Sequence, residues 1–395
     1  MVDVKSILVL GSGQMGSGIG QVALMAGYNV TMVDINDELV NKGVASIEEG
    51  LKKLEAKGQL GEGIKASTLL SKCKKSTDLA TAVKDADLVI EAVIEKMDVK
   101  KNVCKTTMEN GPSHVIFASN TSTMSITEIG KDSGAPKRVC GMHFFNPVAL
   151  MRCIEVIKSD DTSEETFNTA MEVAGKLPCL RGDRYIAPVL KEGPGFIVNR
   201  MNAPVNIFIG WVFDTAKEKG IAWEQIDKDA AGKMPMGPCE LADYVGLDTM
   251  IHVGNYYKET LSSDFEPPKV VKEMVAAGNM GAKTGKGFYD WSKGRDSIKA
   301  KVKEAEPANL FNLEYSMAIM LNEGCRILEE GIASGFKVID DANMAGMNVP
   351  GPFSAGKKNY EKWSQMLEEL AAKTGKDYLR PCELMKSGDF VKMRK

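Results

Sequence analysis

The sequence is poor in histidine, in paired cysteines and in long apolar runs. Only three histidines occur among 395 residues, and the eight cysteines include no Cys-x-x-Cys pair. Scattered cysteines in a chain of this length are typical of reduced, mostly buried thiols rather than of a disulfide framework. No apolar run reaches membrane-spanning length, so we expect no membrane span. The charged segment Met1–Lys5 leads directly into an apolar run, which predicts no signal peptide and a cytoplasmic location. A processed organelle protein would show the same pattern.

Charge of one sign is also scarce. The 50 basic and 53 acidic residues leave a net charge of −3, which provides no basic field for nucleic acid. A hydrophobic content of 44% and a charged content of 26% are typical of a globular protein with a packed core. The length suits two or three domains.

The sequence does contain a glycine motif between two apolar segments that read as buried strands, Ser6–Leu10 and Tyr28–Val33. The motif has the pattern G-x-G-x-x-G and consists of Gly11, Ser12, Gly13, Gln14, Met15 and Gly16. A helical pattern follows it from Ile19 to Met25. Strand, glycine turn, helix and second strand together form the context in which this motif binds a dinucleotide. A glycine turn in another α/β protein is the alternative.

Each position of the motif has a separate physical role. Gly11 allows the tight turn, Gly13 lets the backbone approach a pyrophosphate, and Gly16 lets the helix pack closely on the strand. Asp34 follows the second strand, eighteen residues after Gly16. Its carboxylate would accept the ribose hydroxyls and repel a 2′-phosphate, which favours NAD over NADP.

Two more apolar segments, Leu88–Val93 and Val115–Ser119, read as strands, with a helix over Met97–Glu109 between them. Strands that alternate with helices predict a doubly wound α/β sheet. Ligands of such sheets bind beyond the carboxyl ends of the strands. The polar residues that follow these strand ends are therefore candidate site residues, namely Glu95, Lys100, Asn120 and Ser122.

One histidine is a candidate general base. His114 lies in a Gly-Pro-Ser loop, and His252 lies in a predicted helix where we expect a packing role. His143 instead ends an apolar run and is followed by two phenylalanines that would exclude water. Oxidation of an alcohol requires a group that takes the hydroxyl proton, and imidazole suits this because it titrates near neutrality.

Glu155 is the expected partner of His143. It follows twelve residues later, inside the apolar strand Cys153–Ile157, where a carboxylate needs a partner. An antiparallel return would place the two side by side, and such a pair fixes the tautomer and stabilises the imidazolium. A buried pair that only holds a hairpin together is the alternative.

Several motifs, in this order, resemble those of the L-3-hydroxyacyl-CoA dehydrogenase family. The resemblance covers roughly Ser6–Trp291. Besides the glycine motif, it rests on Ser119–Ser122 (SNTS), His143–Pro147 (HFFNP), Pro194–Arg200 (PGFIVNR), Pro235–Pro238 (PMGP) and Lys283–Tyr289 (KTGKGFY).

The resemblance implies a metal-free, NAD-dependent oxidoreductase that converts (3S)-3-hydroxyacyl-CoA to 3-ketoacyl-CoA in fatty-acid β-oxidation or short-chain acyl-CoA metabolism. It implies that His143 is the general base and Glu155 its partner, and that Ser122 and Asn199 contact the substrate oxygens. It places Lys57 on the CoA moiety, although a companion serine of the family is replaced here by Gly50. The cofactor contacts that it implies are Asp34, Glu95, Lys100, Ser122, Asn146 and Lys283.

The chain departs from the family in two places. The segment Cys179–Gly193 is longer than the usual link, and we expect an extended hairpin there without an assigned role. About 100 residues follow Trp291. They resemble the preceding helical region, because Gly331-Ile-Ala and Gly351-Pro352 repeat the order of Gly220-Ile-Ala and Gly237-Pro238, each after an apolar helix. The two predicted helices are Asn199–Lys219 and Asn309–Glu330.

These observations predict a Rossmann-type NAD-binding domain over residues 1–191, an all-α domain over 192–293, and a degenerate tandem copy of that domain over 294–395. The second copy would replace a dimer partner, so we expect a monomer, with a homodimer as the alternative. Two other functions stay open. One is NAD-dependent oxidation of a free hydroxy acid, which needs no lysine-rich CoA flank. The other is a non-catalytic NAD-binding protein.

Overall fold

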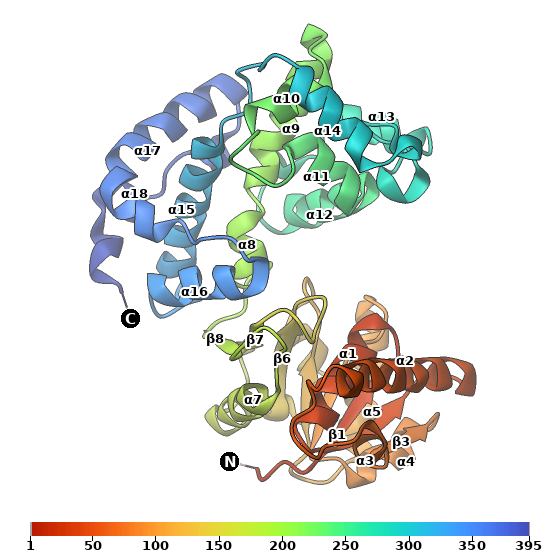
Figure 1. The fold of residues 1–395 in the computed structure, drawn as a ribbon. Helices are drawn as coiled ribbons and strands as arrows, with labels where there is room; N and C mark the ends of the chain where they lie inside the picture. Colours follow the sequence, from red (N-terminus) through yellow and green to blue (C-terminus); the bar gives the residue numbers. More distant parts are fainter. Residues whose placement is uncertain (1, 395) are drawn as a thin grey trace. The chain divides into compact units, whose positions relative to one another are not determined.

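The computed structural model describes residues 2–394 and divides into two compact units (Figure 1). The first unit contains residues up to Val198 together with Glu330–Gly351. The second contains Asn199–Glu329 and Pro352–Met393. Residues 330–351 thus belong to the first unit, which contains the glycine motif. The sequence repeat instead predicts that they belong to the same domain as the helices before and after them.

An eight-stranded sheet forms the centre of the first unit. Its order is β3-β2-β1-β4-β5-β6-β7-β8, and its first six positions are those of a dinucleotide-binding fold. Strands β1 to β6 run parallel, whereas β7 is antiparallel to β6. The strands are β1 Ser6–Leu10, β2 Asn29–Val33, β3 Cys73–Ser76, β4 Leu88–Glu91, β5 Ile116–Ser119, β6 Val139–Phe144, β7 Cys153–Ile157 and β8 Tyr185–Val189.

The helices of the first unit pack on this sheet, and several of them begin at polar side-chain caps. The Asn36 side chain accepts from the Leu39 amide at 2.9 Å, and Ser163 caps α7 in the same way. The apolar residues of β1, β2 and α1, such as Ile7, Val30 and Ile19, share one buried core. The helices are α1 Gln14–Met25, α2 Asp37–Ala56, α3 Ala66–Leu70, α4 Leu79–Ala82, α5 Met97–Asn110, α6 Ile126–Gly130, α7 Glu164–Lys176 and α16 Phe336–Met347.

The prediction of a hairpin at Cys179–Gly193 is wrong. This segment supplies β8, which pairs in parallel with β7 at the edge of the sheet. The reason is the connection, because helix α7 carries the chain from the end of β7 back to its start, and such a crossover produces parallel strands.

Helix α16 joins the first unit through backbone and apolar contacts. The Leu190 amide donates to the Ile332 carbonyl at 2.8 Å, and the Arg152 amide donates to the Ala345 carbonyl at 3.1 Å. The helix packs against β7 and β8 and buries an apolar face that includes Ile339. A segment late in the sequence therefore covers the far edge of the sheet.

The second unit is helical. It contains most of α8 Val198–Asn202, then α9 Val205–Lys219, α10 Trp223–Asp229, α11 Pro238–Val245, α12 Leu247–Thr260, α13 Lys269–Ala276, α14 Arg295–Glu304, α15 Leu313–Glu329, α17 Phe353–Thr374 and α18 Glu383–Ser387. Helices α15, α17 and α18 pack together (Figure 1). The described residues of both units also form short 3-10 segments, namely η1 Val83–Asp85, η2 Pro136–Arg138, η3 Ser263–Phe265, η4 Ala282–Thr284, η5 Trp291–Lys293, η6 Asp377–Leu379 and η7 Asp389–Lys392.

Three sequence predictions change in detail. The predicted helix Asn199–Lys219 is divided into α8 and α9 at Ala203-Pro204, because proline lacks the backbone donor that a continuous helix would need there. The helix expected from Asn309 begins at Leu313. His252 is exposed on α12 rather than packed.

Within residues 2–394, no helix combines the length and the apolar character needed to cross a membrane.

Candidate functional site

The glycine motif forms the turn between β1 and α1. Gly11 has a φ of +98°, and a Cβ there would lie 2.4 Å from the Ala92 carbonyl oxygen. A Cβ on Gly16 would lie 1.7 Å from the Gly11 carbonyl oxygen. Gly13 differs, because a Cβ there would meet no described atom within 4 Å. Two glycines are therefore required by packing, while the third leaves the backbone open to a ligand.

Ser12 and Asp34 join this turn to the end of β2. The Ser12 amide donates to Asp34 Oδ2 at 2.6 Å, and the Ile35 amide donates to Oδ1 at 2.7 Å. Each carboxylate oxygen keeps a second acceptor site. The buried Ser12 hydroxyl has no hydrogen-bond partner among the described residues. An open turn, an orphan hydroxyl and a carboxylate with spare acceptor sites fit a dinucleotide.

A charge cluster at the end of β4 surrounds the buried ammonium of Lys100. Lys100 is 1% exposed, and its ammonium pairs with Glu91 at 2.7 Å and with Glu95 at 3.0 Å. Glu95 also accepts from the Thr121 hydroxyl. Burial raises the pKa of Glu95, but the Lys100 ammonium and the hydroxyl donors lower it by more, so this pKa lies below its usual range. Glu95 is thus an ionised acceptor, and Lys100 is its buried ion-pair partner.

The SNTS segment connects two strand ends. Asn120 follows β5, and its Oδ1 accepts from the Phe144 amide of β6 at 2.9 Å. Ser122 comes two residues later with a half-buried side chain. In the glycine motif, Gln14 Nε2 donates to Asn146 Oδ1 at 3.2 Å. The neighbouring Met15 is half-buried. The structure therefore brings the predicted cofactor residues Gln14 and Asn146 together.

His143 and Glu155 form the pair that the sequence predicts. They lie opposite each other in the antiparallel register of β6 and β7, and His143 Nδ1 is 2.6 Å from Glu155 Oε2. The other carboxylate oxygen accepts from the amides of Ile197 and Val198, at 3.1 Å and 2.9 Å. When Nδ1 donates to this carboxylate, a neutral imidazole carries its lone pair on Nε2, where it can accept a proton.

Two aromatic rings shield this pair from water. The rings of Phe145 and Phe196 have centroids 4.7 Å and 5.7 Å from the His143 ring. Phe196 adopts a φ of +56°, a conformation that costs energy for a bulky residue and is held by the surrounding structure. A Cβ on Gly346 of α16 would lie 3.3 Å from the Phe145 ring. The segment 330–351 thus packs directly against the Phe145 ring.

Three further predicted residues lie at the end of α2 or in the second unit. Lys57 is exposed at the end of α2. A Cβ on Gly50 of that helix would lie 2.2 Å from Gln21 Oε1, so a serine there would displace only the end of the flexible Gln21 side chain. Asn199 is the second residue of α8 and belongs to the second unit. Lys283, also in the second unit, pairs there with Asp248 at 2.6 Å.

The sequence reading missed Glu91, which is fully buried at the end of β4 and accepts from the Ser119 hydroxyl at 2.6 Å. The signal was present, because an acid inside an apolar strand needs a partner. That argument identified Glu155 and applies equally to Glu91. The structure groups no three acidic, histidine or cysteine side chains into a metal site within residues 2–394.

Comparison with known proteins identifies the family of the chain. The family model described as "3-hydroxyacyl-CoA dehydrogenase, NAD binding domain" matches residues 6–179. Its companion, "3-hydroxyacyl-CoA dehydrogenase, C-terminal domain", matches residues 195–291. Human mitochondrial hydroxyacyl-coenzyme A dehydrogenase is 38% identical over 303 residues, which cover 73% of this chain and 92% of that protein. A probable 3-hydroxybutyryl-CoA dehydrogenase of Bacillus subtilis is 38% identical over 74% of this chain and 99% of its own length.

Solved structures extend the similarity to the C-terminal region. The 3-hydroxybutyryl-CoA dehydrogenase of Escherichia coli K12 is 26% identical, has a TM-score of 0.85, and covers 99% of both chains. The Ralstonia eutropha (S)-3-hydroxybutyryl-CoA dehydrogenase is 36% identical with a TM-score of 0.66, over 73% of this chain and 99% of that one. The chain belongs to the 3-hydroxyacyl-CoA dehydrogenase family.

Proposed function

We propose that the protein is an NAD-dependent dehydrogenase that converts (3S)-3-hydroxyacyl-CoA reversibly to 3-ketoacyl-CoA. The observation that carries this proposal is the His143–Glu155 pair on β6 and β7. Strand β6 runs parallel to the strands that carry the glycine turn and the Glu95 cluster. Their carboxyl ends lie at one edge of the sheet, which is where such folds bind ligands.

The chemistry of the proposal follows from the imidazole. Bound NAD would take the hydride from C3 of the substrate. His143 Nε2 takes the hydroxyl proton, while Glu155 keeps the ring oriented and stabilises its positive charge. Phe145 and Phe196 exclude water, so the charge of the pair acts in a medium of low polarity.

The remaining residues take positioning roles in this proposal. Ser122 and Asn199 hold the substrate oxygens, and Lys57 binds the CoA moiety. Asp34, Glu95, Asn146 and Lys283 contact the cofactor, with Lys100 acting behind Glu95 as its buried ion-pair partner. The pathway is fatty-acid β-oxidation or short-chain acyl-CoA metabolism, in the cytoplasm.

Turnover with matched substrates tests the reaction. The purified chain should oxidise NADH with acetoacetyl-CoA and with longer 3-ketoacyl-CoAs, and much more slowly with acetoacetate. Equal rates with acetoacetate would instead favour a dehydrogenase of free hydroxy acids. NADH binding without turnover of any of these compounds would favour a non-catalytic protein.

We also propose that the C-terminal region is a degenerate second copy of the helical domain. Equivalent aspartates support this, because a Cβ on Gly237 would lie 2.4 Å from Asp227 Oδ1 and one on Gly351 would lie 1.9 Å from Asp340 Oδ1. The apolar helices α9 and α15 precede these two aspartates in the same order. The second copy lacks a nucleotide-binding sheet, so each chain would have one active site.

The second copy would take the place of a dimer partner, and the protein would be a monomer. It is present in the same chain and therefore meets the first copy at an effective concentration that no free subunit reaches. Light scattering after size exclusion should give a mass near the 42.9 kDa of one chain. A stable dimer would refute the monomer.

A further inference from the structure

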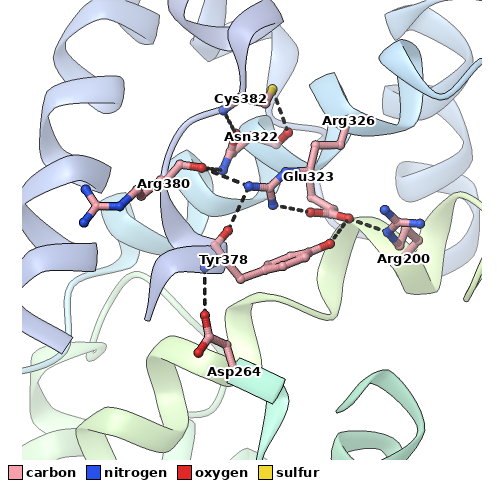
Figure 2. A network of polar contacts seen from close by, with 8 residues as sticks. All are labelled: Arg200, Asp264, Asn322, Glu323, Arg326, Tyr378, Arg380 and Cys382. Carbon is pink, nitrogen blue, oxygen red and sulfur yellow. Dashed lines mark hydrogen bonds and ion pairs between the residues drawn. The ribbon is translucent and has the colours of Figure 1, made fainter. Parts of the chain in front are cut away.

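A buried ion-pair network connects α8 to helix α15 within the second unit (Figure 2). The Arg200 side chain is 2% exposed and its guanidinium donates through Nε to Glu323, whose side chain is 0% exposed. Figure 2 shows the Glu323 carboxylate between Arg200 on one side and Arg326 and Tyr378 on the other. The two ends of the pair are 123 residues apart in the sequence.

Glu323 is fully committed to this network. The Tyr378 hydroxyl donates to Oε1 at 2.9 Å, and Arg326 donates to Oε2 at 2.9 Å. Arg326 also donates to the carbonyl oxygens of Tyr378 and Arg380, both at 2.9 Å. Burial raises the pKa of the Tyr378 phenol above its usual value, so the phenol remains a donor at neutral pH. These contacts fix the carboxylate that Arg200 meets.

The residue before Arg200 is Asn199, the expected contact for the substrate oxygen. Helix α8 has five residues, and a helix this short is not stable without tertiary contacts. Side-chain anchors must therefore set its rotation about its axis. On the N-terminal side, within the first unit, Glu155 binds the amides of Ile197 and Val198. On the C-terminal side, within the second unit, Glu323 binds Arg200.

We propose that Glu323 is a positioning residue that holds Asn199 through Arg200. This inference rests on the proposed function, and it assigns a role in the reaction to a residue beyond 195–291, the range that the family's C-terminal domain model matches. Arg200 is a suitable connector, because its planar guanidinium fixes direction as well as distance. Misplacement of a positioning group by about 1 Å can cost on the order of 10²-fold in rate.

The test is a double-mutant cycle on acetoacetyl-CoA reduction. Glu323→Gln keeps the shape of the side chain and removes its charge, so kcat/KM should fall by on the order of 10- to 100-fold. The KM for NADH should not change. If Glu323 acts through Asn199, then Glu323→Gln should cause no further loss in an Asn199→Ala background. Independent, multiplicative losses would overturn the proposal.

Glu314→Gln is the matched control. Glu314 lies on the same helix and accepts from Lys362 and Trp363 of α17, at 2.6 Å and 2.9 Å. Its substitution should leave kcat/KM within about twofold. Equal losses from Glu314→Gln and Glu323→Gln would overturn the proposal, because general destabilisation of α15 would then explain both.

A milder variant covers the case in which Glu323→Gln does not fold. Tyr378→Phe removes only the hydroxyl that fixes Glu323, and kcat/KM should fall by on the order of 3-fold. This loss should also disappear in the Asn199→Ala background, and its persistence would overturn the proposal. A wild-type chain that reduces neither acetoacetyl-CoA nor longer 3-ketoacyl-CoAs would refute the proposed function itself, whereas an active wild type with additive variants refutes only the role of Glu323.

Discussion

Two glutamates, one in each unit, are completely buried and hold the chain on the two sides of Asn199. Glu155 binds the His143 ring and the amides of Ile197 and Val198. Glu323 binds two guanidinium groups, those of Arg200 and Arg326, and a phenol. Both carboxylates satisfy the rule that a buried charge needs partners, but the partners of the two glutamates are of different chemical types.

The partner of Glu155 is an imidazole, whereas the partners of Glu323 are two guanidinium groups and a phenol. Imidazole is the side chain whose unperturbed titration falls between about pH 5 and 8. Guanidinium keeps its charge throughout the accessible range. We therefore expect changes around Glu155 to alter the pH dependence of turnover, and changes around Glu323 to alter its magnitude at every pH. The predictions below test this separation, in order of decreasing effect.

The largest effect should come from His143→Ala. Removal of a general base should lower kcat by on the order of 10²–10⁴, while NADH binding is largely retained because the glycine turn is untouched. Single-turnover kinetics and NADH fluorescence titration measure the two quantities. A His143→Ala enzyme with near-normal turnover would remove imidazole from the mechanism and with it the contrast between the two glutamates.

Glu155→Gln should cost less, on the order of 10–10² in kcat/KM. The amide cannot stabilise an imidazolium, and its NH₂ group can donate to Nδ1 and so favour the wrong tautomer. The pH profile of kcat/KM should shift in Glu155→Gln and keep its midpoint in Glu323→Gln. If both variants shift the midpoint equally, the two glutamates do not have separate roles.

Asp34→Ala should change cofactor choice rather than the pH profile. Loss of the carboxylate removes its repulsion of a 2′-phosphate, so the ratio of kcat/KM for NAD over NADP should fall by roughly 10-fold. The control is Asp37→Ala, which removes an exposed acid from the first turn of α2. A wild-type enzyme that uses NAD and NADP equally would show that Asp34 does not occupy the ribose position.

The smallest effect is expected from Lys57→Ala. An exposed ammonium that contacts a phosphate contributes little, so the KM for acetoacetyl-CoA should rise by roughly 2- to 5-fold, and less at high salt. Lys52→Ala on the same helix removes an ammonium that already pairs with Glu48 at 2.6 Å and serves as the control. If the KM for acetoacetyl-CoA is the same in Lys57→Ala and Lys52→Ala, then Lys57 does not bind the CoA moiety.

The sequence alone predicted those parts of the fold and the candidate site that depend on short-range pattern. The strands around the glycine turn, the carboxylate of Asp34 and the pairing of His143 with Glu155 all follow from periodicity, turn chemistry and spacings of fewer than twenty residues. The structure confirms the sheet that these elements form. The same local argument would also have identified Glu91.

Features that depend on pairing between distant segments could not be read in this way. The parallel direction of β8, the inclusion of α16 in the first unit and the ion pair between Arg200 and Glu323 each join segments whose local patterns allow other partners. A lone arginine or glutamate in a helix is usually an exposed charge, and nothing in its neighbours in the sequence identifies a partner 123 residues away. Packing decides such pairs, because burial makes an unpaired charge so costly that each must find its counterpart in the folded chain.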